Sequence, residues 1–117
     1  MGQRFCLALD LVDDAAAIAA YEDWHRPGNV PADVVASIRN AGIEEMEIFR
    51  TGNRLVMIID ASDDFSFDRK AAMDAADSAV IDWEKRMLEY QRPRSNAEGA
   101  EKWELMRSIY RLTDQPS

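Results

Sequence analysis

The stretch EMEIFRTGNRLVMII, residues 45–59, decides the fold. Residues 45–49 alternate charged and apolar side chains, as a half-exposed strand does. Residues 51–54 have turn-forming character, and residues 55–59 are an unbroken apolar run. Two strands joined by so short a turn form a β-hairpin, and we expect its apolar second strand to lie deep in a sheet.

Strand and helix patterns flank this hairpin on both sides. Residues 5–11 alternate with a period of two, which predicts a strand. Residues 15–24 follow two aspartates that can cap a helix, and residues 31–42 run from a proline to a glycine; both have helical composition. Beyond the hairpin, residues 65–79 and 80–90 predict a second helix pair, with a new cap near their junction.

The last segment, residues 103–112, is compatible with either a helix or a fourth strand. With a strand there, the order is βαββαβ, the ferredoxin-like arrangement with a four-stranded antiparallel sheet and helices on one face. The 117 residues suit one domain, residues 1–117, and leave no second layer for the other face. We therefore expect an α+β fold whose sheets pack together in a homodimer, a dimeric α+β barrel.

Composition excludes several classes of function. The net charge of −8 disfavours binding to nucleic acid or to an anionic membrane surface. No apolar stretch approaches the roughly 20 residues that cross a bilayer. The single cysteine, Cys6, excludes an internal disulfide framework and a multi-cysteine metal site. Because the N-terminus begins directly with a strand pattern instead of a secretory signal, we expect a cytoplasmic protein.

The only histidine, His25, stands four residues after Tyr21. On a helix this spacing puts phenol and imidazole side by side, and imidazole is the side chain best suited to moving a proton near neutral pH. No cluster of acidic residues with metal-ligand spacing surrounds His25, and no phosphate-binding loop or nucleophile elbow occurs. The pair is the first candidate for a catalytic site.

The order of elements, the spacing of Tyr21 and His25, and Pro31 six residues further on resemble the L-rhamnose mutarotase family. Trp83 and Met87 match a tryptophan and a methionine at the same spacing in that family's last helix. The resemblance covers most of the chain. It implies a dimeric ferredoxin-like enzyme, without metal or organic cofactor, that interconverts the α and β anomers of a 6-deoxy sugar such as L-rhamnose or L-fucose.

The resemblance also assigns roles to individual residues. It implies that His25 is the proton donor and that Tyr21 and Trp83 contact the sugar. At two positions the chain departs from the family: Met46 replaces a tyrosine that usually faces the sugar, and Glu84 replaces a second tryptophan. Both residues are expected in the pocket wall, so the sugar recognised can differ from L-rhamnose.

Several parts of the expected site stay open. The base that complements the histidine is a carboxylate or water, and the sequence places neither. Met46, Met57 or Ile59 could line the niche for the C6 methyl group, depending on which strand face points inward. Arg94 and Trp103, at the ends of a polar connection, could close over the pocket of their own subunit or of its partner.

Two other functions are compatible with the same fold. One is a monooxygenase-like enzyme, in which a solitary histidine could bind haem. The other is a small-molecule binding module without catalysis. A Soret band would indicate the first, and sugar binding without faster anomer exchange would indicate the second.

Overall fold

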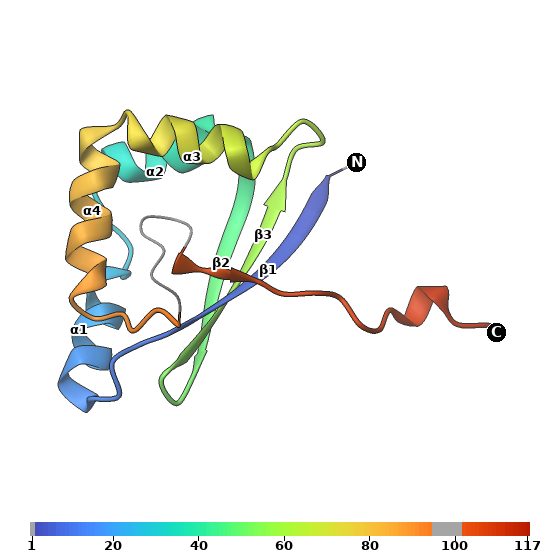
Figure 1. The fold of residues 1–117 in the computed structure, drawn as a ribbon, viewed down its shortest axis with the longest axis horizontal. Coiled ribbons are helices and arrows are strands. Elements are labelled where there is room, and N and C mark those ends of the chain that lie inside the picture. The colour runs from blue at the N-terminus through green and yellow to red at the C-terminus, as the bar shows by residue number, and fades with distance from the viewer. Residues whose placement is uncertain (1, 95–101) are drawn as a thin grey trace.

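A computed structural model describes residues 2–94 and 102–117 of the chain. The expected βαββαβ order is present, and each helical connection consists of two helices (Figure 1). Along the chain the elements are β1 (Gln3–Asp10), α1 (Ala15–Trp24), α2 (Ala32–Asn40), β2 (Ile43–Thr51), β3 (Arg54–Ala61), α3 (Phe67–Ala75), α4 (Ser78–Leu88) and β4 (Glu104–Leu105). The α+β class expected from the sequence is therefore confirmed.

The hairpin forms as the sequence predicts. β2 and β3 pair antiparallel up to Thr51 opposite Arg54, and Gly52 in the turn adopts the left-handed φ of 56°. β3 lies inside the sheet because β1 pairs with its other edge, from Gln3 opposite Ala61 onward. The strand order is β2-β3-β1-β4, with every pairing antiparallel.

The C-terminal segment is a strand only at its start. β4 has two residues, with Leu105 opposite Leu7 of β1, and Met106 adds a backbone hydrogen bond to Cys6. No helix forms over residues 103–112, and the chain continues without regular structure to a short 3-10 turn, Leu112–Asp114. Residues 104–106 hydrogen-bond to the free edge of β1. This pairing, and not the helical spacing of the apolar residues, determines the structure at the start of the segment. Residues 95–101 of the polar connection lie outside the described residues.

All four helices lie on one side of the sheet, and the C-terminal tail leaves the body on the other side (Figure 1). The helix-covered face carries two groups of buried side chains. The first lies near α2 and the start of α3: Leu7, Ala41, Ile43, Met57, Ile59, Ala61 and Phe65. The second lies near α1 and α4: Leu11, Tyr21, Leu55 and Met87. We call them the α2–α3 end and the α1–α4 end; the candidate site lies where they meet.

Candidate active site

Helix α1 brings Tyr21 and His25 together. The Asp14 side chain fixes its start by accepting from the Ala17 backbone N–H at 2.9 Å. The helix ends at Trp24, and His25 is its C-cap residue, with φ −96° and ψ 4°. The imidazole stacks on the Tyr21 ring, with ring centroids 4.3 Å apart and planes inclined by 30°. The predicted side-by-side arrangement is confirmed.

A single hydrogen bond fixes the tautomer of His25. Nδ1 lies 2.7 Å from the backbone carbonyl oxygen of Tyr21. A carbonyl can only accept, so Nδ1 carries the proton and Nε2 of the neutral ring keeps its lone pair. Burial lowers the pKa of His25 from its ordinary 6.5, although the bond to the Tyr21 carbonyl opposes this effect. Near pH 7 the ring is therefore neutral, with Nε2 ready to accept a proton.

Whereas His25 can accept a proton, Tyr21 keeps its own. Its side chain is buried, and burial raises the pKa of the phenol far above its ordinary value, while a hydrogen bond with the Gln91 side chain partly opposes that rise. The phenol therefore stays protonated at every physiological pH. It can donate a hydrogen bond, but it is a poor acid.

Two tryptophans flank this pair. Trp83 of α4 meets the His25 ring edge-on, with centroids 5.5 Å apart, and Trp24 meets Trp83 at 6.0 Å. Trp24 uses its indole N–H to donate to the Tyr90 hydroxyl at 3.2 Å. No described residue accepts from the indole N–H of Trp83, which is half-buried at the cavity. Trp83 thus offers an apolar face and a donor.

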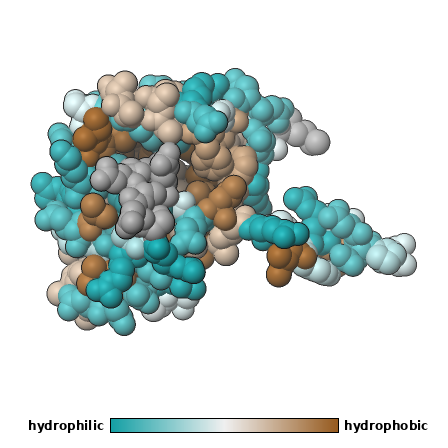
Figure 2. All heavy atoms as spheres, viewed as in Figure 1, coloured by the Kyte–Doolittle hydropathy of each residue, from teal (hydrophilic) through white to brown (hydrophobic). Residues whose placement is uncertain are grey.

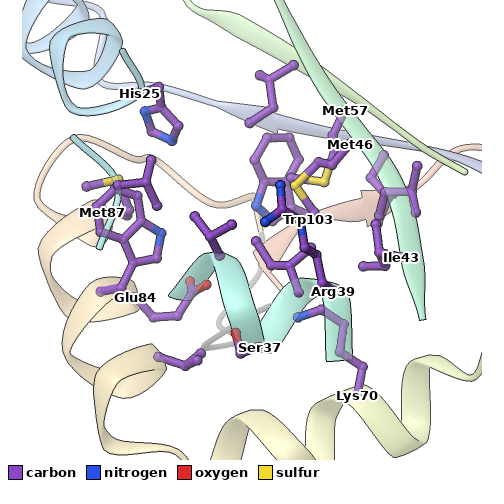
Figure 3. Close-up of a pocket in the computed structure, with 18 of the residues that line it drawn as sticks. His25, Ser37, Arg39, Ile43, Met46, Met57, Lys70, Glu84, Met87 and Trp103 are labelled. Atoms are coloured by element: carbon purple, nitrogen blue, oxygen red, sulfur yellow. The ribbon is translucent and has the colours of Figure 1, made fainter. Parts of the chain in front are cut away.

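A cavity of about 460 Å³ lies between these aromatic residues and the sheet. Figure 3 shows His25, Met87 and Glu84 on one side of it and Met46, Met57 and Trp103 on the other. The sheet contributes mainly sulfur and hydrocarbon, whereas the helices contribute the polar groups. Such a mixture of an apolar wall and a few convergent polar groups is typical of small-molecule sites.

The structure brings all five residues singled out from the sequence to this one cavity. The five are Tyr21, His25, Met46, Trp83 and Glu84. Met57 and Ile59 line it as well, so the strand face bearing all three candidates for an apolar niche points inward. Trp103 lines the cavity of its own subunit. Arg94 is not among the described lining residues. Its side chain is exposed, and its Nε lies 3.5 Å from Oε1 of Glu104.

Sequence reasoning missed a polar cluster behind the cavity. Lys102 is only 1% exposed, and its Nζ lies 2.6 Å from Oε1 of Gln91 and 3.0 Å from Oε2 of Glu84. Gln91 is buried too, and it joins this cluster to Tyr21. Neither residue belongs to a periodic pattern, and a lysine in a polar connection is ordinarily exposed. The sequence offered no signal for either.

The described part of the chain contains neither a candidate metal site nor a helix that could span a membrane. Its histidine, cysteine and acidic residues form no group of three or more that could hold a metal ion. Among the same residues, no helix combines the length and apolar character that crossing a membrane needs.

Sequence comparisons give matches along almost the whole chain. A family model described as L-rhamnose mutarotase matches residues 4–112. An L-fucose mutarotase from Xanthomonas campestris pv. campestris is 46% identical over 115 residues, covering 98% of this chain and 92% of that protein. A UPF0734 protein from Dictyostelium discoideum is 30% identical over 115 residues, covering 94% and 90%.

Solved structures share the fold at lower sequence identity. An L-rhamnose mutarotase from Formosa agariphila superposes with a TM-score of 0.61 at 15% identity, covering 94% of this chain and 98% of that one. Tetracenomycin F2 cyclase from Streptomyces glaucescens, a type-II polyketide cyclase, also gives 0.61 at 18% identity, covering 94% and 96%. At these identities the likeness concerns the fold alone, because one fold hosts several chemistries.

Proposed function

The chain belongs to the L-rhamnose mutarotase family, an isomerase family whose reaction is sugar anomer interconversion, and on this premise we propose that its substrate is L-fucose. The relative named L-fucose mutarotase, 46% identical, supports this choice of sugar. Met46 and Glu84, which replace residues typical of the family, favour a sugar other than L-rhamnose. L-rhamnose is the second candidate. Membership of this family favours catalysis over the haem-binding and purely ligand-binding alternatives.

In this proposal His25 moves the one proton that the reaction requires. Ring opening breaks the C1–O5 bond, turns the C1–O1 bond into a carbonyl, and transfers a proton from O1 to O5. Both oxygens are attached to C1, so one nitrogen can take the proton from O1 and deliver it to O5. Nε2 of the neutral His25 ring has the lone pair for the first half, and the imidazolium so formed is the donor for the second.

Ring closure repeats these steps in reverse. After rotation about C1–C2, O5 attacks the other face of the aldehyde carbon and returns its proton to His25, which passes it to O1. The proposal therefore needs no separate complementary base. The Tyr21 hydroxyl donates a hydrogen bond to whichever oxygen carries the developing negative charge, a preorganised interaction of the oxyanion-hole kind.

The remaining lining groups hold the sugar. Trp83 stacks against the C–H face of the pyranose, and Glu84 accepts from a hydroxyl group. Met46, Met57 and Ile59 surround the C6 methyl group, which an apolar wall accommodates better than a hydroxymethyl group.

Exchange NMR of the anomeric proton signals tests this function directly. L-fucose is compared with L-rhamnose, which differs in configuration at C2 and C4, and with L-galactose, which adds only a hydroxyl group at C6. We expect the protein to speed exchange most for L-fucose and least for L-galactose. Faster exchange of L-rhamnose than of L-fucose would reverse the assignment, and exchange at the buffer rate for every sugar would refute it.

The homodimer expected from the sequence is also part of this proposal. On the sheet face without helices, Cys6 pairs with Ile58 and Ala8 with Val56, which makes a half-buried apolar strip. The tail beyond β4 stands clear of the body (Figure 2), and its apolar side chains are exposed, as is Leu105 at the end of β4; those of the tail are Met106, Ile109, Tyr110 and Leu112. A second copy would cover both surfaces.

Light scattering tests the assembly. We expect twice the subunit mass of 13.3 kDa for the wild type. Ile58→Asp should yield monomers, whereas Ala36→Asp, at an exposed position of α2, should not. A monomeric wild type would contradict the dimer.

The proposal also includes a cytoplasmic location and a single mutarotase-like domain. The lone free cysteine supports the first, and the family match over residues 4–112 supports the second.

A further inference from the structure

The ammonium group of Lys102 is buried among polar partners. Its Nζ donates hydrogen bonds to Oε1 of Gln91 at 2.6 Å and to the Glu84 backbone carbonyl at 3.4 Å. It also forms an ion pair with Oε2 of Glu84 at 3.0 Å. Burying a charge is costly, and a hydrophobic side chain would fill the same space at lower cost. The position of Lys102 therefore calls for a reason beyond packing.

The bond from Lys102 fixes which way Gln91 faces. Because Oε1 accepts from the ammonium, the amide NH₂ is the end left to face the Tyr21 side chain. Gln91 is buried, so its NH₂ group needs an acceptor, and the Tyr21 side chain is its hydrogen-bond partner. Since the phenol oxygen accepts from Gln91, the phenol proton is free to point elsewhere, and Tyr21 lines the cavity.

We propose that Lys102 is a positioning residue for the sugar site: it orients Gln91 so that Tyr21 presents its hydroxyl as a donor to the cavity, and it holds the Glu84 carboxylate at the cavity wall as an acceptor. This inference rests on the proposed function. It specifies the polarity of the site, one fixed donor from α1 and one fixed acceptor from α4. A sugar is then selected by the hydroxyl groups that match this pattern.

The test is a double-mutant cycle on sugar anomer exchange. Lys102→Met removes the ammonium and keeps most of the side chain, while Tyr21→Phe removes the hydroxyl that Lys102 is proposed to orient. Losing a hydrogen bond to a charged group is expected to lower kcat/KM by about 10- to 100-fold. In the Tyr21→Phe background, Lys102→Met should lower it by clearly less, because the part that acts through the Tyr21 hydroxyl is already lost and only the part that acts through Glu84 remains. An equal loss in both backgrounds would overturn the proposal.

Two companion variants guard against misfolding. Gln91→Leu cuts the relay but leaves the ion pair of Lys102 and Glu84, and it should show the same dependence on the Tyr21 hydroxyl. Lys102→Arg keeps the positive charge and should therefore be more active than Lys102→Met. If the lysine only filled space, the two variants would be equally active. Lys85→Met, an exposed lysine of α4, should leave the exchange rate unchanged.

A second readout separates this inference from the proposed function. The two side-chain amide protons of Gln91 should give separate, slowly exchanging NMR signals in the wild type, and Lys102→Met should shift both. This measurement needs no sugar. If no sugar is turned over but the signals respond, the proposed function fails and the relay stands. If sugars are turned over but the signals do not respond, the relay fails alone.

Discussion

The two ends of the helix-covered face are both buried, yet they are built from different materials. At the α2–α3 end, Phe65 meets the rings of Phe5 and Phe67 with centroids 5.8 and 5.0 Å apart, and the other fully buried side chains there are aliphatic or methionine. At the α1–α4 end the aromatic residues carry polar atoms, and two of them bond other side chains: Tyr21 bonds Gln91, and Trp24 bonds Tyr90.

This difference indicates that the α2–α3 end contributes mainly to stability, whereas the α1–α4 end orients the groups proposed to act on the sugar. Hydrocarbon packing is non-directional and leaves no group with a fixed orientation, whereas the hydrogen bonds of Tyr21 and His25 decide which of their atoms face the cavity. The His25 tautomer is set in this way by one carbonyl oxygen. Substitutions at the two ends should therefore affect different measurable quantities.

The largest effect is expected at the α1–α4 end. His25→Ala removes the proposed proton carrier, and general acid–base catalysis is typically worth about 10²–10⁴-fold in rate. We expect anomer exchange to fall by that order while the free energy of unfolding changes little, since His25 is half-buried at the end of a helix. Undiminished exchange in this variant would remove His25 from the mechanism.

The opposite pattern is expected at the α2–α3 end. Phe65 is 6% exposed, and truncating a buried phenylalanine to alanine costs about 3–5 kcal/mol of stability. Phe65→Ala should lower the free energy of unfolding by this amount in denaturant titration. Anomer exchange per folded molecule should stay near the wild-type rate. A large loss of that rate would mean that the two ends are not separable.

The pH dependence sharpens the comparison, because it depends on His25 alone. Catalysis needs the neutral ring, and burial lowers the pKa of His25 from 6.5. As pH falls from 8, kcat/KM should therefore decline with a midpoint below 6.5. In Phe65→Ala the same acid limb should remain. Any residual activity of His25→Ala should lack it; a limb persisting there would point to another titrating group.

The parts of the molecule that could be predicted from sequence are those set by near neighbours. The hairpin, the helix pairs and the contact of Tyr21 with His25 follow from periods of two, or from spacings of three and four, within short stretches. The same holds for the junction of α3 and α4, where the Asp77 side chain accepts from Ala79 at 3.0 Å.

The rest depends on partners far away along the chain. β4 is short because only the edge of β1 holds it, opposite Leu7 and Ala8, and no pattern within residues 103–112 carries that information. The burial of Lys102 likewise depends on Gln91 and Glu84, which are 11 and 18 residues away. The family resemblance pointed to the cavity residues, but it could not place the polar cluster behind them.

The smallest effect is expected when a helix cap is removed, and one cap from each end allows the two ends to be compared. Asp14 caps α1 by accepting from Ala17 at 2.9 Å, and Ser66 caps α3 by accepting from Arg69 at 3.2 Å. Replacing either cap by alanine should cost about 1 kcal/mol in thermal or denaturant unfolding. We expect neither variant to change kcat by more than about twofold, because a lost cap frays the first turn and the bonds that orient His25 lie in the last turn of α1. If Asp14→Ala lowers kcat and Ser66→Ala does not, α1 moves as one unit, and the orientation of the imidazole depends on the whole helix.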